Sequence, residues 1–156
     1  MDVQIRKIAA VDYLQAIDVI KRSNIHSLGK IYPKKLIDEF CKKYDLEKFK
    51  KRAQEIQYFV AEDVDTHRIL GIIGLKDNEL RTFFVDPKHQ GKGIGRKLYN
   101  RLEKEAREEG IKELILEGSP LGEPIYKHLG FKKMRTIYKE RINIKYTDAY
   151  MKKVIS

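Results

Sequence analysis

Residues 79–110 constrain the fold of this chain most strongly, because they predict a strand, a glycine-rich loop and a helix in direct succession. Leu80–Val85 is a run of β-branched and aromatic residues, and Asp86-Pro87 ends it because proline has no backbone donor. Gly110 is typical of a helix C-terminus. The helix before it is predicted by apolar residues at a four-residue spacing, which are Ile94, Leu98, Leu102 and Ala106.

The loop in this segment, Gln90–Gly95, carries glycine at three alternate positions. Glycines so placed are unfavourable unless the backbone turns sharply or a ligand approaches it closely. The free amides and positive dipole end of a helix N-terminus attract anions, and Lys92 and Arg96 add charge beside them. We therefore expect a phosphate or pyrophosphate ligand here, and a tight turn that binds nothing is the alternative.

The spacing of the glycines excludes two common phosphate-binding loops. No Gly-Lys-Ser/Thr follows at the distance that a P-loop needs, and Gly-x-Gly-x-Gly differs from the dinucleotide fingerprint. The loop instead resembles the pyrophosphate loop of the GNAT superfamily of N-acetyltransferases, Gln/Arg-x-x-Gly-x-Gly/Ala, which Gln90, Gly93 and Gly95 match. A second resemblance is Tyr126-x-x-x-Gly-Phe131, which matches the end of the last helix in that family.

This resemblance implies an acyltransferase that passes the acetyl group of acetyl-CoA directly to a primary amine of a small molecule, peptide or protein. Tyr126 is the implied general acid, since a phenol with a reference pKa near 10 can protonate a thiolate. Glu79 is the implied base, and the backbone amide of Phe83 the implied oxyanion donor. The residues implied to bind acetyl-CoA are Phe83, Phe84, Val85, Gln90, Gly91, Lys92, Gly93, Ile94, Gly95, Arg96, Ser119 and Tyr126.

Three of these positions have a plainer interpretation from the residues alone. Without the motif, Tyr126 would be a packed helix tyrosine and Glu79 a solvated residue at the start of a strand. Ser119 stands where many family members have asparagine, and a serine hydroxyl donates one hydrogen where an amide donates two. The contact with the pantetheine arm is therefore expected to differ in detail from the family pattern.

The element order predicts a mixed α/β (α+β) fold in a single domain. The resemblance implies a mostly antiparallel sheet flanked by helices, with a splayed central strand pair. We expect residues 1–56 to form a strand and acceptor-side helices, residues 57–131 the acetyl-CoA-binding core, and residues 132–156 two final strands.

Some local expectations concern the two ends of the chain. Leu14, Ile17 and Ile20 predict the buried face of a helix that ends near Ser23. In the last part, core or cross-strand packing is expected for the tyrosines, namely Tyr138, Tyr146 and Tyr150.

Composition restricts the class of protein. The chain has 156 residues, of which 42% are hydrophobic, so a core can form without disulfides. Its single cysteine, Cys41, rules out an internal disulfide and favours a cytoplasmic location. No segment has the length of a membrane span, and the four histidines lack ligand spacing, so neither a membrane nor a metal is expected.

The net charge of +10 raises the question of a polyanionic partner. Residues 21–52 hold eleven Lys or Arg against four acids, which predicts either a solvated helical face or a surface for an anionic acceptor or nucleic acid. A nucleic-acid module ranks below the enzyme, because the region lacks interleaved exposed aromatics. A CoA-sensing domain without turnover is a third hypothesis, a homodimer is left open, and the acceptor is expected beside Tyr32 and Tyr44.

Overall fold

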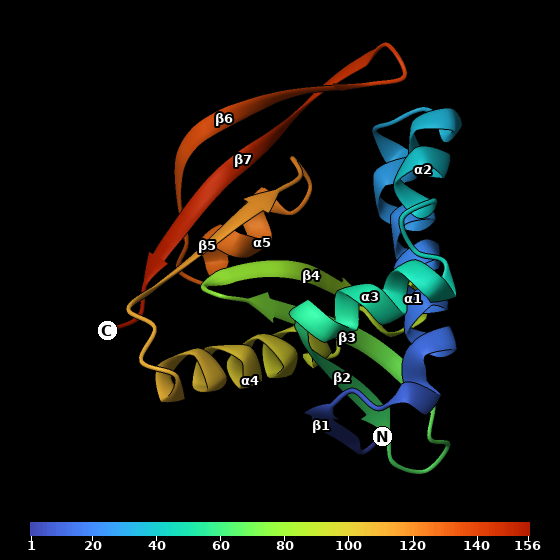
Figure 1. Ribbon diagram of the computed structural model, residues 1–156, viewed down its shortest axis with the longest axis vertical. Helices are drawn as coiled ribbons and strands as arrows, with labels where there is room; N and C mark the ends of the chain where they lie inside the picture. The colour runs from blue at the N-terminus through green and yellow to red at the C-terminus, as the bar shows by residue number, and fades with distance from the viewer.

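A computed structural model describes residues 1–156 and forms one seven-stranded sheet with helices on both faces (Figure 1). The strand order is β1-β2-β3-β4-β5-β7-β6, and every neighbouring pair is antiparallel except β4 and β5. This confirms the predicted mixed, mostly antiparallel fold. The strands are β1 (Val3–Lys7), β2 (Gln57–Asp63), β3 (Ile69–Lys76), β4 (Glu79–Val85), β5 (Glu113–Gly118), β6 (Lys132–Arg141) and β7 (Ile144–Val154).

The helices divide between the two faces of the sheet. They are α1 (Tyr13–Ser27), α2 (Lys34–Cys41), α3 (Leu46–Glu55), α4 (Ile94–Glu108) and α5 (Glu123–His128), with 3-10 turns η1 (Ala10–Asp12), η2 (Leu28–Lys30) and η3 (Pro87–His89). Side chains alternate along β2, so Phe59 packs toward α4 while Tyr58 and Val60 pack toward α1 and α3. The apolar residues predicted for α4 are all buried, as the four-residue spacing requires.

The sheet opens between β4 and β5. These strands pair only at Glu79 and Ile115, whereas β5 pairs with β7 over its full length from Glu113 to Gly118. Figure 1 shows β4 and β5 diverging from this point toward the side where α1 and α2 lie. The predicted splay is therefore present, and it leaves backbone groups of β4 without a strand partner.

Three local expectations are wrong. α1 does not end near Ser23 but continues to Ser27, because Ser23 is buried and its hydroxyl donates to the Val85 carbonyl at 3.0 Å. Leu14 is 67% exposed, since the face of α1 that packs on the core runs through Tyr13, Ala16, Ile17 and Ile20. Tyr138 is 83% exposed, so core packing is wrong for it, although it pairs with Thr147 on the neighbouring strand. None of the helices combines the length and apolar character that a bilayer crossing requires.

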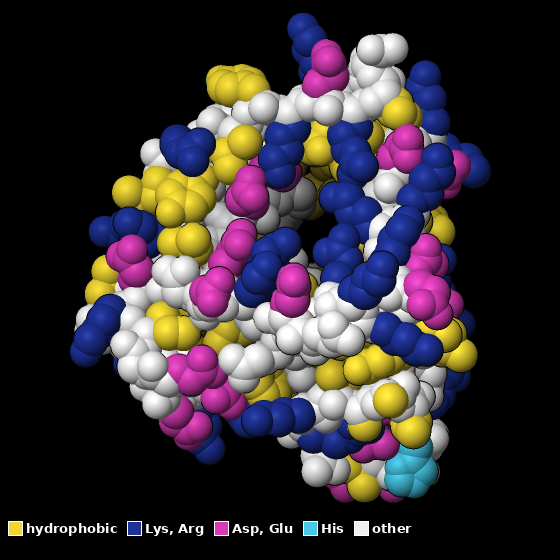
Figure 2. Space-filling model, viewed as in Figure 1, with side chains coloured by type: hydrophobic (Ala, Val, Ile, Leu, Met, Phe, Trp, Pro, Cys, Tyr) yellow, Lys and Arg dark blue, Asp and Glu magenta, His cyan; other side chains and the backbone are white.

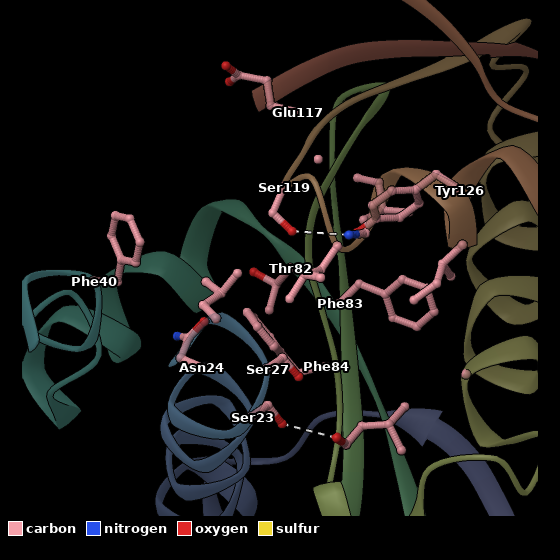
Figure 3. A pocket seen from close by; sticks show the side chains of 18 of the residues that line it. Ser23, Asn24, Ser27, Phe40, Thr82, Phe83, Phe84, Glu117, Ser119 and Tyr126 are labelled. Carbon is pink, nitrogen blue, oxygen red and sulfur yellow. Dashed lines mark hydrogen bonds between the residues drawn. The ribbon is translucent and has the colours of Figure 1, made fainter. Parts of the chain in front are cut away.

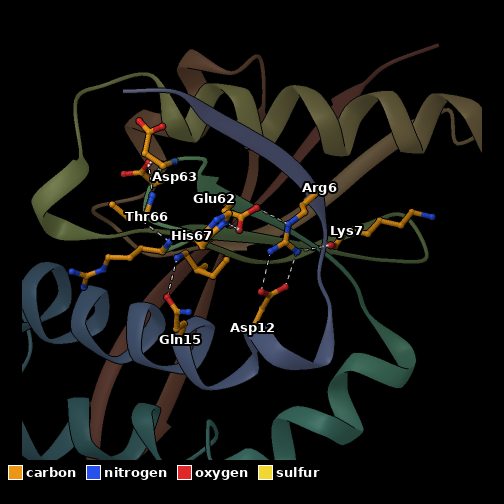
Figure 4. Close-up of polar contacts among 11 residues, drawn as sticks. Arg6, Lys7, Asp12, Gln15, Glu62, Asp63, Thr66 and His67 are labelled. Carbon is orange, nitrogen blue, oxygen red and sulfur yellow. Dashed lines mark hydrogen bonds and ion pairs between the residues drawn. The ribbon is translucent and has the colours of Figure 1, made fainter.

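Arg6 joins the first strand to two other elements (Figure 4). Its guanidinium contacts both carboxylate oxygens of Asp12, at 2.7 and 3.0 Å, and Glu62 on β2 at 3.0 Å. Burial opposes ionisation of Asp12, but the hydrogen bonds from Arg6 and from the Ala9 amide prevail, and its pKa lies below the ordinary value. The pair holds the start of α1 against the edge of the sheet.

Replacing Arg6 by alanine should lower the free energy of unfolding by about 2–3 kcal/mol, because the buried Asp12 carboxylate then lacks its counter-ion. In thermal unfolding this corresponds to a Tm lowered by roughly 5–10 °C. An ion pair that lowers the pKa of a carboxyl stabilises the folded protein at pH values above the unfolded pKa of that carboxyl. The Tm difference between the parent and Arg6→Ala should therefore disappear as the pH falls through the lower, folded pKa of Asp12.

The matched control for this measurement is Arg68→Ala, because Arg68 is exposed and its side chain makes no ion pair. Its Tm should stay within about 1 °C of the parent. Equal losses in both variants, or a loss for Arg6→Ala that persists in acid, would contradict the role given to the Arg6–Asp12 pair.

Candidate active site

The opening between β4 and β5 leads into a cavity of about 640 Å³ (Figure 3). Its lining comes from parts of the chain that are far apart in sequence, including α1, β4, the glycine-rich loop, β5, α5 and the β6–β7 hairpin. In Figure 3, Phe83 and Phe84 lie on β4 between Tyr126 on one side and Ser23, Asn24 and Ser27 of α1 on the other. The splay of the two strands thus produces a cavity lined by segments from most of the chain.

The backbone of β4 presents free polar groups to this cavity. The Asp86 amide donates to the Leu70 carbonyl on β3 at 2.7 Å. Because backbone groups alternate in direction along a strand, the N–H and C=O of Phe84 also point to β3, whereas those of Phe83 and Val85 point to the opening. The Val85 carbonyl accepts hydrogen bonds from the Ser23 hydroxyl at 3.0 Å and from the Gln90 side-chain amide at 3.2 Å. The N–H and C=O of Phe83 therefore have no strand partner and are directed at the cavity.

The side chains of the two phenylalanines serve different cores. Phe83 packs toward the α4 side and lies 3.5 Å from the position that a Cβ on Gly95 would occupy. Phe84 packs toward α1 on the other face. Both also line the cavity, so each is at once part of a core and part of the site.

The glycine-rich loop ends at the N-terminus of α4, as predicted. Gly91 and Gly93 have φ of 77° and 81°, in the left-handed region that favours glycine, and no other group lies within 4 Å of their missing side chains. Gly93 is the N-cap, so the amides of residues 94–96 have no intrahelical partner. Lys92 and Arg96 are exposed beside this cradle but do not line the cavity. The residues fit an anionic diphosphate group.

Asp86 anchors the loop to α1. Its buried carboxylate receives two hydrogen bonds from Arg22, at 3.0 and 2.8 Å, and one from the Lys88 amide at 3.0 Å. Burial would raise the pKa of Asp86, but the Arg22 guanidinium and the Lys88 amide outweigh it and hold the pKa below its usual range. Asp86, which the sequence assigned only to the end of the strand, thereby fixes the direction in which the loop leaves β4.

Tyr126 lies across the cavity from Phe83, with 6.2 Å between ring centroids. Its ring packs on the backbone at Gly118 and Gly122, where an added Cβ would come within 3.0 Å of ring carbons. Burial, and then the negative charge of Asp148, raise the pKa of the Tyr126 hydroxyl well above its ordinary value. The hydroxyl is therefore protonated at neutral pH, and no protein group takes its hydrogen bond.

Ser119 lies on the same side as Tyr126 and lines the cavity. Its Oγ accepts a hydrogen bond from the Gly122 amide at 3.1 Å, which orders the turn into α5. The Ser119 hydroxyl hydrogen is still free to be donated to a ligand in the cavity.

Glu79 lies elsewhere. It is at the point where β4 still pairs with β5, it does not line the cavity, and its carboxylate is 3.5 Å from the Arg81 guanidinium. The carboxylates that do line the cavity are Glu117 and Asp148, which Lys139 bridges at 3.2 and 2.9 Å. Sequence reasoning missed both, because neither belongs to a motif.

The far end of the cavity is aromatic. Tyr32 and Phe40 from the α2 region meet Tyr146 of β7, with ring centroids 5.5–6.1 Å apart. The Tyr32 hydroxyl is buried and has no hydrogen-bond partner. Tyr32 and Tyr44, which were expected beside the acceptor, both line the cavity. No group of three His, Cys, Asp or Glu side chains is arranged to hold a metal ion.

The loop, the splayed strands and the tyrosine occur together in a known family. A profile of the acetyltransferase (GNAT) domain matches residues 27–153. The chain belongs to the GNAT acetyltransferase family. This confirms the resemblance inferred from the loop and from Tyr126, and it makes the chain an acyltransferase of this family. A search of curated proteins finds no significant match.

Solved GNAT structures extend the likeness over nearly the whole chain. The PaiA N-acetyltransferase of Thermoplasma acidophilum in complex with coenzyme A is 27% identical, with a TM-score of 0.83, and the match covers 99% of this chain and 100% of that one. A GCN5-related N-acetyltransferase from Rhodopseudomonas palustris has a TM-score of 0.89 at 17% identity, covering 99% and 97%. The Escherichia coli ribosomal-protein-S18-alanine N-acetyltransferase has a TM-score of 0.74 at 19% identity, and the match covers 99% of this chain and 95% of that one. At under 25% identity, the Rhodopseudomonas and Escherichia proteins show the shared fold.

Proposed function

We propose that this GNAT protein transfers the acetyl group of acetyl-CoA directly to a primary amine. The observation that carries the proposal is the opening between β4 and β5, where free Phe83 backbone groups and an unbonded, protonated Tyr126 hydroxyl face one cavity. Support for acetyl-CoA as the co-substrate also comes from the 27% identical relative, whose structure contains coenzyme A.

Each group that acetyl-CoA brings has a complementary partner in the chain. The diphosphate suits the free amides at the start of α4, with Gly91 and Gly93 leaving room and Lys92 and Arg96 adding charge. The pantetheine amides suit the exposed edge of β4 and the Ser119 hydroxyl. The thioester supplies an electrophilic carbon, and the cavity is large enough for that group together with an acceptor.

The proton balance of the reaction assigns the remaining roles. As the amine nitrogen bonds to the acetyl carbon, the C–S bond breaks, and the Tyr126 hydroxyl supplies the proton that the sulfur takes up. The Phe83 amide donates to the acetyl oxygen, where negative charge develops. The amine must lose a proton, and we propose that water carries it to the Glu117–Lys139–Asp148 cluster, while solvent returns a proton to the Tyr126 phenolate. Glu79, the base predicted from the sequence, does not line the cavity and lies beside Arg81.

The proposed function is tested by two measurements on the wild-type protein. Calorimetric titration with acetyl-CoA should give one site in the micromolar range, and incubation with acetyl-CoA and primary amines should release free CoA thiol. Binding without thiol release from any amine would instead support a CoA-sensing domain. No heat of binding would overturn the acetyltransferase proposal.

The two candidate bases can be separated with a matched pair of variants. Glu117→Gln should lower kcat/KM for the amine about a hundredfold, because loss of general-base assistance has effects of that size. Glu79→Gln makes the same chemical change on the neighbouring strand and should alter kcat/KM less than threefold. The measurement is initial-rate thiol release over a range of pH. A larger loss for Glu79→Gln would restore the sequence-based assignment and remove Glu117 from the mechanism.

A further inference from the structure

The acceptor end of the cavity is surrounded by cations from both sides of its opening. Lys43 follows α2, Lys139 lies on β6, and Arg81 lies on β4; all three line the cavity. Arg52 on α3 and Arg141 on β6 lie close enough to act on Lys43 electrostatically. Figure 2 shows Lys and Arg side chains gathered around the hollow between the β6–β7 hairpin and the α2–α3 region.

These cations differ in whether the protein already neutralises them. Lys139 is bridged to Glu117 and Asp148 at 3.2 and 2.9 Å, and Arg81 lies 3.5 Å from Glu79. Lys43, Arg52 and Arg141 form no ion pair with a carboxylate; Arg52 and Lys43 instead lie over the rings of Tyr44 and Phe40, at 5.4 and 6.0 Å. The opening therefore carries positive charge that no protein group compensates.

The environment of Lys43 reflects this excess. Although the residue as a whole is exposed, partial burial of its ammonium lowers the pKa, and the charges of Arg141, Arg52 and Lys139 lower it further. Asp148 is the only acid that acts in the opposite direction, and it is already held by Lys139. An anion bound at this point would relieve the repulsion among four cations.

Two further features favour an anion attached to a partly apolar body. The buried Tyr32 hydroxyl has no protein partner, so it can donate to an oxygen of a ligand. Around it, Tyr32, Phe40 and Tyr146 form an aromatic surface through edge contacts. The charge and the apolar surface lie on the same side of the cavity, away from the start of α4.

We propose that the acceptor is an amine that also carries a carboxylate or phosphate group, bound through Lys43 and the Tyr32 hydroxyl, with Arg52 and Arg141 adding positive charge nearby. This inference rests on the proposed acetyl transfer and names its substrate class. The same cations disfavour the ammonium form of the acceptor, so they increase the fraction of the neutral amine that attacks. A polyamine would bring several positive charges to this opening and would be repelled.

The test compares amines that differ only in the anionic group. L-phenylalanine and L-phenylalaninamide form one pair, O-phosphoethanolamine and ethanolamine a second, and spermidine is the polycation. In thiol-release assays with saturating acetyl-CoA, kcat/KM should be about tenfold or more higher for the anionic member of at least one pair. The pair that responds distinguishes a carboxylate from a phosphate, and the preference should decrease at high salt.

A matched pair of variants assigns the effect to the opening. Lys43→Met should lower the preference about tenfold, whereas Lys42→Met should leave it unchanged, because Lys42 pairs with Glu39 at 3.1 Å and does not line the cavity. Calorimetric binding of N-acetyl-L-phenylalanine and its amide, in the presence of CoA, gives the same comparison without turnover. Tighter binding of the acid is expected in the parent and in Lys42→Met.

The inference is overturned by equal kcat/KM within both pairs, by fastest turnover of spermidine, or by the same preference in both lysine variants. If no amine turns over, equal binding of N-acetyl-L-phenylalanine and its amide overturns it. Failure of the proposed function looks different, because the wild-type protein would then give no heat with acetyl-CoA. Binding of acetyl-CoA and acetylation of a neutral amine would leave the proposed function standing and remove only the anionic acceptor.

Discussion

Gly93→Val should weaken acetyl-CoA binding at least a hundredfold. Gly93 has φ of 81°, and a β-branched residue there adopts a conformation that costs about 1–2 kcal/mol. Its side chain would also enter the open space over the free amides at the start of α4, where the diphosphate is proposed to bind. Strain and steric exclusion therefore act together, and calorimetric titration with acetyl-CoA measures their sum.

The control for this variant lies at the other end of the same helix. Gly110 has φ of 79° and also has no other group within 4 Å, so Gly110→Val introduces similar strain in similar open space. Both variants should lose a similar amount of stability in thermal unfolding, but Gly110→Val should bind acetyl-CoA like the parent. Affinity of Gly93→Val within tenfold of the parent would place the diphosphate somewhere other than this loop.

Tyr126→Phe should lower kcat by about 100- to 1000-fold while leaving the affinity for acetyl-CoA within a few-fold, since only the proton donor is removed. The raised pKa keeps the wild-type hydroxyl protonated, so activity that depends on it should persist through neutral pH and fall only when pH rises through that folded pKa. The pH–rate profile of thiol release tests this, and the variant should lose its dependence on the phenol.

Two companion variants separate the hydroxyl from the packing of the ring. Gly118→Ala keeps the hydroxyl but adds a Cβ 3.0 Å from the Tyr126 ring, so kcat should fall through displacement of the acid. Tyr138→Phe removes a phenol that is 83% exposed and should have no effect. Wild-type kcat in Tyr126→Phe would show that water protonates the leaving thiolate, and Tyr126 would then be a packing residue.

The parts of the site that local sequence determines are those built from one continuous segment. Proline after a β-branched run ends β4, alternate glycines give the loop its left-handed turns, and a four-residue apolar spacing buries one face of α4. Backbone conformation and helix periodicity depend on residues a few positions apart, so they are readable in the chain. For the same reason Tyr126 was found through a short pattern that starts on α5 and ends at Phe131.

The parts that sequence reasoning missed depend on which segments meet. The length of α1 is set by the contact of Ser23 with Val85, 62 positions away, which no local breaker signal reveals. Glu117 and Asp148 come together only because β5 pairs with β7, and Glu79 is kept outside the cavity because β4 and β5 still pair there. The excess of Lys and Arg in residues 21–52 was visible in the sequence, but the sequence did not show which of these side chains lie at the cavity.

The sequence by itself therefore determined the family, the glycine-rich loop at the start of α4 and the tyrosine of the cavity. Tertiary structure decided which charges gather near the far end of the cavity, because Lys43 and Arg141 belong to segments nearly a hundred residues apart that only the folded chain brings close together. The charge of a side chain follows from its residue type. The electrostatic potential at a site depends on the distances between charged residues, and only the folded chain fixes those distances.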